Sequence, residues 1–216
     1  MTVNPEYVVA ARRNPRFRAV LNSADLALAD GVGILWAARL LRKPAPDRIT
    51  GNDLVEAVAA MEHENKRIFL LGAAEGVAEE AALVLRRRHP SAGIVGTFSG
   101  DSHPSGWDEI ASALAAAKPT VLFVAFGHPR QDLWIAANRE RLESHGILVA
   151  SGVGGVYVYL SGRVTRAPGI LRRLGLEWLY RLVRQPWRWR RQTVLPVFVL
   201  LVIVEAIRAR SGVNRL

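Results

Sequence analysis

Arginine is concentrated in one stretch of the sequence, residues 163–191. This stretch contains nine Arg, no Lys and one acid, Glu177, so its formal charge is +8. The planar guanidinium group donates two parallel hydrogen bonds, which suits it to phosphate and diphosphate ligands. The stretch also holds Trp178, Trp187 and Trp189, a residue type that settles at membrane–water interfaces. These residues together predict the binding of a phosphate-bearing ligand at a membrane surface.

The distribution of charge bears on which partner this stretch would meet. Residues 1–162 contain 17 basic and 17 acidic side chains and sum to zero, whereas the whole chain is +10. A nucleic-acid-binding protein is expected to spread basic residues over its body, so the neutral body argues against nucleic acid as a partner. The remaining alternative is a basic helix that packs on the body and points its Arg side chains into water.

Asp30 is a candidate general base, because it follows a short apolar stretch and precedes Gly31. The alternative, an Asp that bonds its own backbone in a turn, is the better interpretation from these residues alone. No Asp-x-Asp pair and no His/Asp cluster has the spacing of metal ligands, and the chain has no Cys. We therefore expect no metal and no other cofactor. Arg side chains would have to neutralise the charge of a departing diphosphate.

Short apolar runs alternate with helical patterns along residues 1–162. This alternation predicts an α/β fold, a Rossmann-like parallel sheet with helices on both faces, with ligands beyond the carboxyl ends of the strands. We expect an α/β catalytic domain over residues 1–162, and an Arg/Trp-rich, helical, membrane-associated appendage with an apolar tail over residues 163–216. The predicted strands are 25–29, 67–71, 93–97, 120–126 and 147–150, and the predicted helices are 6–21, 33–41, 53–64, 75–88, 107–117 and 131–143.

Two loops at predicted strand ends contain residues suited to a ligand. Gln131 and Asp132 stand at a helix start after the most apolar strand, although an acid there also stabilises a helix without any ligand. Nearby His128 is expected to be a surface histidine. Gly152 and Gly154 allow close approach of the backbone to a ligand. Because Arg163 and Arg166 lie just downstream, this second loop is expected to bind a diphosphate.

The longest apolar run is Val194–Val204, eleven residues with Pro196 inside. A spanning helix needs about 20 apolar residues, so this run is better interpreted as lying in the membrane interface. The alternative is a C-terminal helix buried in a homo-oligomer contact. The first residues of the chain contain no apolar segment of the kind found in secretory signals.

Eight motifs occur in order between Thr2 and Arg191. They are TVNPE at 2–6, ADL at 24–26 with ADGVG at 29–33, DRITGND at 47–53, FLLG at 69–72, GHPRQDLW at 127–134, GVGG at 152–155, GRVTRAP at 162–168, and GLEWLYRL at 175–182 with Pro186, Arg188 and Arg191. Together and in this order they resemble the WecG/TagA/CpsF family of glycosyltransferases.

The resemblance implies an inverting, metal-independent glycosyltransferase, peripheral to the cytoplasmic face of the cell membrane. It would move an N-acetylmannosamine-type sugar from a UDP-sugar to undecaprenyl-diphosphate-linked N-acetylglucosamine, in cell-envelope polysaccharide or teichoic acid synthesis. By motif position, Asp30 matches the proposed base, and Thr2 and Asn4 match acceptor-site or catalytic residues. The substrate-binding residues expected on this basis are Arg48, Gln131, Asp132, Gly152, Gly154, Arg163, Arg166, Arg181, Arg188 and Arg191.

The sequence departs from the family pattern at several points. Val158 stands where an acid is usual, and Asp132 and Gln185 stand where Glu is usual. The family usually carries a strand and a helix before the Thr-x-Asn segment, which here opens the chain. Two other functions therefore stay open: an inactive relative of the family, and a non-enzymatic module that binds a lipid diphosphate.

Overall fold

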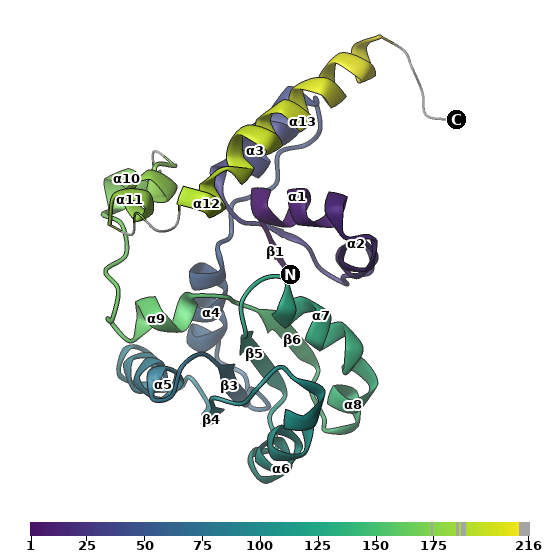
Figure 1. Cartoon of the computed structure of the whole chain (residues 1–216). Coiled ribbons are helices and arrows are strands. Elements are labelled where there is room, and N and C mark those ends of the chain that lie inside the picture. The colour runs from purple at the N-terminus through teal and green to yellow at the C-terminus, as the bar shows by residue number, and fades with distance from the viewer. Residues whose placement is uncertain (174, 185, 187–188, 212–216) are drawn as a thin grey trace. The chain divides into compact units, whose positions relative to one another are not determined.

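The computed structural model describes residues 1–173, 175–184, 186 and 189–211, and the chain forms two compact units (Figure 1). The sheet unit comprises Gly51–Thr165 together with Met1, and the terminal unit comprises Thr2–Thr50 and Arg166–Leu216. The N-terminal fifty residues thus pack with the segment that was expected to form an appendage. A catalytic domain over residues 1–162 stays a prediction.

The sheet unit is built on four parallel strands in the order β4-β3-β5-β6. In the centre, β3 and β5 pair in register from Ile68↔Val121 onward, and β5 pairs with β6. Every residue of β3 is buried, as a run of Ile, Phe and Leu predicts for a central parallel strand. The strands are β3 (Ile68–Gly72), β4 (Ile94–Phe98), β5 (Val121–Ala125) and β6 (Val149–Gly152).

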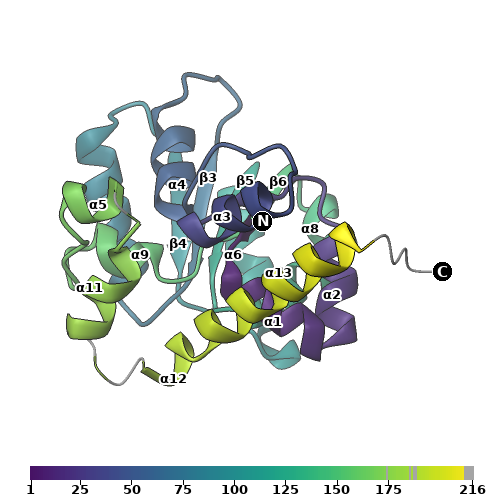
Figure 2. The same cartoon turned by 90° about the horizontal axis from the view of Figure 1, so that it is seen from above.

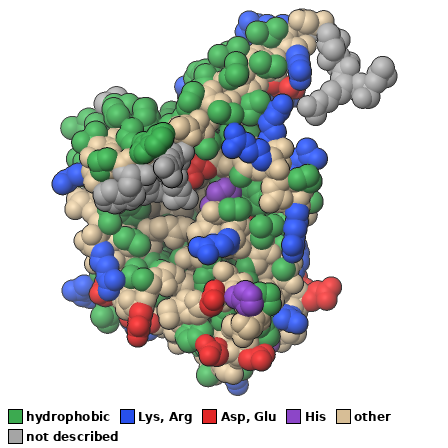
Figure 3. All heavy atoms as spheres, in the orientation of Figure 1, with side chains coloured by type: hydrophobic (Ala, Val, Ile, Leu, Met, Phe, Trp, Pro, Cys, Tyr) green, Lys and Arg blue, Asp and Glu red, His purple; other side chains and the backbone are tan. Residues whose placement is uncertain are grey.

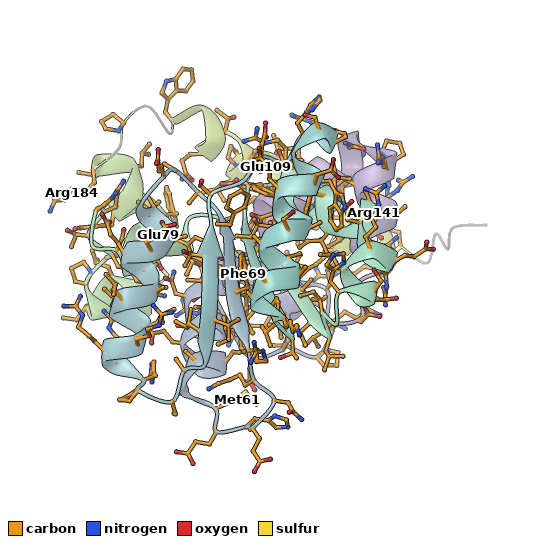
Figure 4. The ribbon with its side chains drawn as sticks, turned by 90° about the horizontal axis from the view of Figure 1, so that it is seen from below. Met61, Phe69, Glu79, Glu109, Arg141 and Arg184 are labelled. Atoms are coloured by element: carbon orange, nitrogen blue, oxygen red, sulfur yellow. The ribbon has the colours of Figure 1, made fainter. Side chains whose placement is uncertain are left out.

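Helices cover both faces of this sheet, which confirms the predicted fold class. Ile68 and Leu70 of β3 pack into one apolar cluster, and Phe69 and Leu71 pack into a second, because successive side chains of a strand point to opposite faces. Figure 4 shows Glu79 of α5 and Glu109 of α6 on opposite sides of the strands. The first cluster includes α4 (Gly51–Ala60), α5 (Val77–Arg88) and α9 (Val156–Leu160), and the second includes α6 (Trp107–Ala117), α7 (Arg130–Ala137) and α8 (Arg139–Ser144).

The terminal unit contains a separate sheet of two short parallel strands, β1 (Thr2–Val3) and β2 (Leu28–Ala29). The strand before Asp30 was expected to join the main sheet, and that expectation is wrong. Leu26 is 63% exposed, so this segment lacks the apolar burial that a strand of the main sheet requires. The helices of the unit are α1 (Pro5–Arg13), α2 (Pro15–Asn22), α3 (Val32–Leu40), α10 (Gly169–Arg173), α11 (Glu177–Arg184), α12 (Trp189–Gln192) and α13 (Val194–Arg210).

Two predicted helices are each broken into two. The predicted helix over 6–21 ends before Pro15, because a proline disfavours the helical conformation in the residue that precedes it. Asn14 instead caps α2, its Oδ1 accepting a hydrogen bond from the amide of Phe17 at 3.0 Å. The predicted helix over 131–143 breaks at Asn138, whose side-chain amide donates to the carbonyl of Trp134 at 2.9 Å.

The apolar tail forms α13, which lies along α1 and α3 (Figure 2). Phe198 and Val202 of α13 pack with Val9 of α1 and Ala37 of α3 in one buried cluster. The three helices meet at Gly33, where an added Cβ would lie 2.8 Å from Pro5 Cγ and 3.6 Å from Phe198 Cε1. None of the helices in the described ranges has the length and apolar character needed to span a membrane.

Candidate functional site

The predicted site residues fall into both units, and each set has its own local geometry. Arg188 lies outside the described residues, and for Arg181 in α11 and Arg191 in α12 only the backbone is described. The sheet unit carries Gln131, Asp132, Gly152, Gly154 and Arg163, and the terminal unit carries Thr2, Asn4, Asp30, Arg48, Arg166, Arg181 and Arg191.

In the sheet unit, the loop after β5 and the turn after β6 are joined through Gln131. Its Oε1 accepts a hydrogen bond from the amide of Gly154 at 3.0 Å. A Cβ placed on Gly152 would lie 2.5 Å from Gln131 Nε2 and 2.7 Å from Asp132 Oδ1. The structure therefore brings four predicted residues together, because β5 and β6 are neighbours and both strands end here.

His128 is largely buried, so its interpretation as a surface histidine is wrong. Its side chain is 13% exposed, and its Nδ1 lies 3.9 Å from Oδ2 of Asp132, whose side chain is fully buried. His128 precedes α7, and Asp132 lies in the first turn of that helix, so the two side chains approach each other at the helix start.

Arg163 is held by a residue that sequence reasoning missed. Its Nε and Nη2 donate to the two carboxylate oxygens of Glu80 at 2.8 Å each, and both side chains are 44% exposed. This bidentate hydrogen bond lowers the pKa of Glu80 and raises the pKa of Arg163. The pair fixes the guanidinium beside Gly76, where an added Cβ would lie 3.3 Å from Nη2. A diphosphate that binds Arg163 would compete with Glu80 for the two N–H donors of the guanidinium group.

In the terminal unit, the pairing of β1 with β2 brings three predicted residues together. The register Thr2↔Leu28 and Val3↔Ala29 leads directly into Asn4 and Asp30, which follow the two strands. The amide of Asp30 donates to the carbonyl of Val3 at 2.7 Å. Thr2, in β1, is 5% exposed.

Arg48 lies beside the same strand end. It forms a parallel bridge with Ala29, and the amide of the following residue, Ile49, donates to the carbonyl of Ala29 at 3.0 Å. A cationic residue is thereby placed next to the strand that leads into Asp30. At the level of the backbone, the structure places Asn4, Asp30 and Arg48 at the carboxyl end of the small sheet, and Thr2 lies within the sheet in β1.

Asn4 has a structural role that limits what it can do in a reaction. Its Oδ1 accepts hydrogen bonds from the amides of Glu6 and Tyr7 at 2.9 Å and 3.3 Å, so Asn4 caps α1, a role for which Asn is strongly preferred. A catalytic contact would therefore have to come from its side-chain Nδ2. Losing such a cap costs about 1 kcal/mol, so an Asn4→Ser variant, which keeps a capping oxygen, is the cleaner probe of catalysis.

Arg166 connects two parts of the terminal unit. Its Nη2 donates to Oγ1 of Thr50 at 3.3 Å, and its Nε lies 4.0 Å from Oε1 of Glu177 at the start of α11. The turn before α11 is close-packed as well, since a Cβ on Gly175 would lie 2.7 Å from Val32 Cγ1. Arg166 and Arg163 were both expected to bind a diphosphate; Arg166 is assigned to the terminal unit and Arg163 to the sheet unit, and their shared role stays a prediction.

Groups of three or more His, Cys, Asp or Glu that could hold a metal ion do not occur within the described ranges. Close pairs of acidic and basic side chains around the candidate residues include Arg163 with Glu80, Arg166 with Glu177, and His128 with Asp132.

Comparison with known proteins gives consistent matches over nearly the whole chain. A family model described as "Glycosyl transferase WecG/TagA/CpsF family" matches residues 1–212. A Bacillus spizizenii protein named N-acetylglucosaminyldiphosphoundecaprenol N-acetyl-beta-D-mannosaminyltransferase is 39% identical over 204 residues, which cover 94% of this chain and 77% of that protein. Proteins of the same name from Bacillus subtilis and Staphylococcus aureus are 36% and 32% identical over 205 residues, covering 94% and 92% of this chain and 78% and 77% of theirs.

Proposed function

Because this chain belongs to the WecG/TagA/CpsF family of glycosyltransferases, we propose that it transfers an N-acetylmannosaminyl group from a UDP-sugar to undecaprenyl-diphosphate-linked N-acetylglucosamine. The observation that carries this proposal is similarity over 94% of the chain to a relative whose name states that acceptor and that sugar. UDP is the carrier that we propose for the sugar.

The chemical step is a direct displacement at the anomeric carbon. The acceptor hydroxyl oxygen forms the new bond as its proton passes to the carboxylate of Asp30, and the bond from the anomeric carbon to the diphosphate oxygen breaks. UDP leaves with the electron pair on the side opposite the attack, so the configuration inverts. A carboxylate of ordinary pKa is ionised at neutral pH and can accept this proton. The hydrogen bond from the Asp30 amide to Val3 anchors the backbone of the base.

Arginine side chains supply the charge that the departing diphosphate needs. Negative charge develops on the leaving oxygen, and a guanidinium fork that meets it stabilises the transition state more than the bound donor. We assign this role to Arg181, Arg188 and Arg191. Arg48 and Arg163 are proposed to bind the substrates in the ground state, with Arg163 exchanging Glu80 for phosphate oxygens.

We also propose that α13 docks the protein in the plane of a membrane. Its buried face is Phe198, Val202 and Ala206, and its opposite face is apolar as well. Figure 3 shows hydrophobic side chains gathered along α13 and over α10 and α11. The exposed apolar residues of α13 are Val199, Leu200, Ile203, Val204 and Ile207.

The charges of α13 suit a membrane surface. At about 100° per residue, Glu205 lies roughly 140–160° around the helix from Leu200 and Ile203, away from the exposed apolar face. Arg208 and Arg210 stand in the last turn, where they can meet anionic headgroups. A helix with one face packed on its own protein and the other apolar and exposed fits peripheral attachment, which we place at the cytoplasmic leaflet where UDP-sugars occur.

Replacing Leu200, Ile203 and Ile207 with Gln is expected to abolish co-sedimentation with vesicles of anionic phospholipid. Each change removes an apolar side chain that would otherwise move from water into the lipid. That transfer stabilises the membrane-bound state by up to about 1.5–3 kcal/mol for each side chain. The melting temperature should stay close to that of the wild type, because the buried face of α13 is untouched. Phe198→Ala changes the buried face of α13 instead of the exposed one, and it should lower the free energy of unfolding by about 3–5 kcal/mol. Undiminished sedimentation of the triple variant would refute docking through this face.

Release of UDP by the purified protein tests the proposed reaction. With UDP-N-acetylmannosamine and lipid-linked N-acetylglucosamine together, we expect UDP to appear in proportion to product lipid, and omission of the acceptor should stop it. UDP binding without turnover for any UDP-sugar would instead favour an inactive relative. Binding of the lipid diphosphate without UDP binding would favour the non-enzymatic module.

A further inference from the structure

Gln131 and Asp132 were expected to contact substrate, but their surroundings assign them another task. We infer that they are positioning residues, which hold the Gly152–Gly155 turn in the shape that the donor diphosphate requires. This inference deepens the proposed function and rests on it for the kinetic readout only. The structural part concerns the sheet unit alone.

The first observation is the hydrogen bond between Gln131 Oε1 and the amide of Gly154. Gln131 is 2% exposed, and its side chain is among the largest fully buried ones. Gly154 has a φ of +57°, a left-handed conformation that glycine adopts readily but that is one of several open to it. The bond from Gln131, 23 residues earlier in the chain, restricts the turn to this one conformation.

The second observation is the closeness of Gly152 to both side chains. An added Cβ would lie 2.5 Å from Gln131 Nε2 and 2.7 Å from Asp132 Oδ1, distances that real Cβ atoms do not reach without displacing something. The φ of Gly152 is not among the positive values. Position 152 therefore needs glycine for space rather than for backbone freedom, because the end of β6 lies directly against Gln131 and Asp132.

The third observation is the burial of Asp132. Its side chain is fully buried, and His128 Nδ1 lies 3.9 Å from its Oδ2. Burying a carboxylate is costly unless nearby dipoles or charges compensate for it. The start of α7 provides such a dipole. A fully buried carboxylate packed against Gly152 is suited to fix the end of β6 relative to α7.

The start of α7 and the turn after β6 thus behave as one rigid piece. If that turn approaches the diphosphate, a shift of about 1 Å at Gly154 would misplace the anomeric carbon and cost on the order of 10²-fold in rate. Gln131 would matter to the reaction without touching the sugar-nucleotide.

Gln131→Ala tests the inference in the full-length protein by amide hydrogen exchange, which requires no substrate. Removing the acceptor is expected to speed exchange across residues 152–155 by about tenfold or more. Gln131→Glu keeps an oxygen for the Gly154 amide, and it is expected to restore most of the protection at a pH where the new carboxyl group is protonated, because a second carboxylate beside buried Asp132 would be repelled. Asn138→Ala is the matched control, because it removes a side-chain hydrogen bond from the same helix and should leave this turn unchanged.

Kinetics supply the second arm. Gly152→Ala and Gln131→Ala should each lower kcat by roughly 10²-fold with little change in the KM for the acceptor. In the double variant the new methyl group gains room, so the loss should be clearly smaller than the product of the two single losses.

Unchanged exchange at residues 152–155 in Gln131→Ala, or fully multiplicative kinetic losses with a raised KM for the UDP-sugar, would overturn the inference in favour of direct substrate contact. If the wild type transfers no sugar at all, the proposed function fails, and the exchange experiment still decides the positioning role.

Discussion

Asp30→Asn is expected to lower kcat for sugar transfer by about 10²–10⁴-fold, the usual contribution of a general base. The amide side chain has nearly the same shape as the carboxylate but cannot accept the proton of the acceptor hydroxyl. The backbone of residue 30 should keep its place, because its amide still donates to the carbonyl of Val3. The measurement is the initial rate of UDP release at saturating substrates, together with UDP affinity by calorimetry, which should stay close to the wild-type value.

Asp108→Asn is the control for this prediction. Asp108 lies exposed in the first turn of α6 in the sheet unit, and the same change there should leave the rate within about twofold, since exposed substitutions usually have small effects. Equal UDP release by wild type and Asp30→Asn would reject Asp30 as the base. Weaker UDP binding by Asp30→Asn, with kcat unchanged, would assign the carboxylate to donor binding instead.

The joint replacement of Arg181, Arg188 and Arg191 by Gln is expected to lower kcat by 10³-fold or more. Removing a single preorganised donor to a developing oxyanion typically costs about 10²–10³-fold, and these three are proposed to act on one leaving group. Lys at the same positions should restore little of the rate, because an ammonium group cannot reproduce the bidentate fork. Single-turnover rates with donor and acceptor bound will separate this loss from weaker binding.

Loss of charge must be distinguished from loss of geometry in that experiment. Gln at Arg12, Arg13 and Arg16 removes the same charge from exposed positions of the same unit and should change kcat by less than about threefold at physiological salt, where exposed charges are screened. Similar losses in both triple variants would mean that net positive charge, rather than these three arginines, accelerates the reaction.

The elements that could be predicted from sequence are those whose local pattern agrees with their environment. The apolar run around β5 and the helix from Trp107 to Ala117 have strong local signals, and both occur in the structure. The Asn14-Pro15 pair was a sequence signal for a break in the predicted helix over 6–21. The helical pattern on either side of this pair nevertheless favoured one continuous helix. The segment before Asp30 is short, and its pairing with β1 depends on residues far away in the sequence.

Contacts between remote segments account for what sequence reasoning missed. Val9 and Phe198 lie at opposite ends of the chain, and no local pattern indicates that α1 and α13 share a core. Apolar residues lie around most of the circumference of α13. This pattern was the sequence signal that one face of the helix packs against the protein while another is exposed. Glu80 lies on α5 with nothing in its neighbourhood to mark it as the partner of Arg163. Gly152, at the end of β6, was predicted as a ligand contact, while its closeness to Gln131 appears only once β5 and β6 are paired.

Product formation in the presence of a chelator is the most direct test of the whole account. Wild type and Asp30→Asn would be incubated with UDP-N-acetylmannosamine, lipid-linked N-acetylglucosamine and excess EDTA. The molecular mass of the lipid product would then be measured by mass spectrometry. We predict that the wild type converts the acceptor to a lipid heavier by one N-acetylhexosamine residue and that Asp30→Asn does so at a small fraction of that rate. A wild-type product that appears only after Mg²⁺ is restored, or no product with either protein, would contradict transfer driven by Asp30 and arginine.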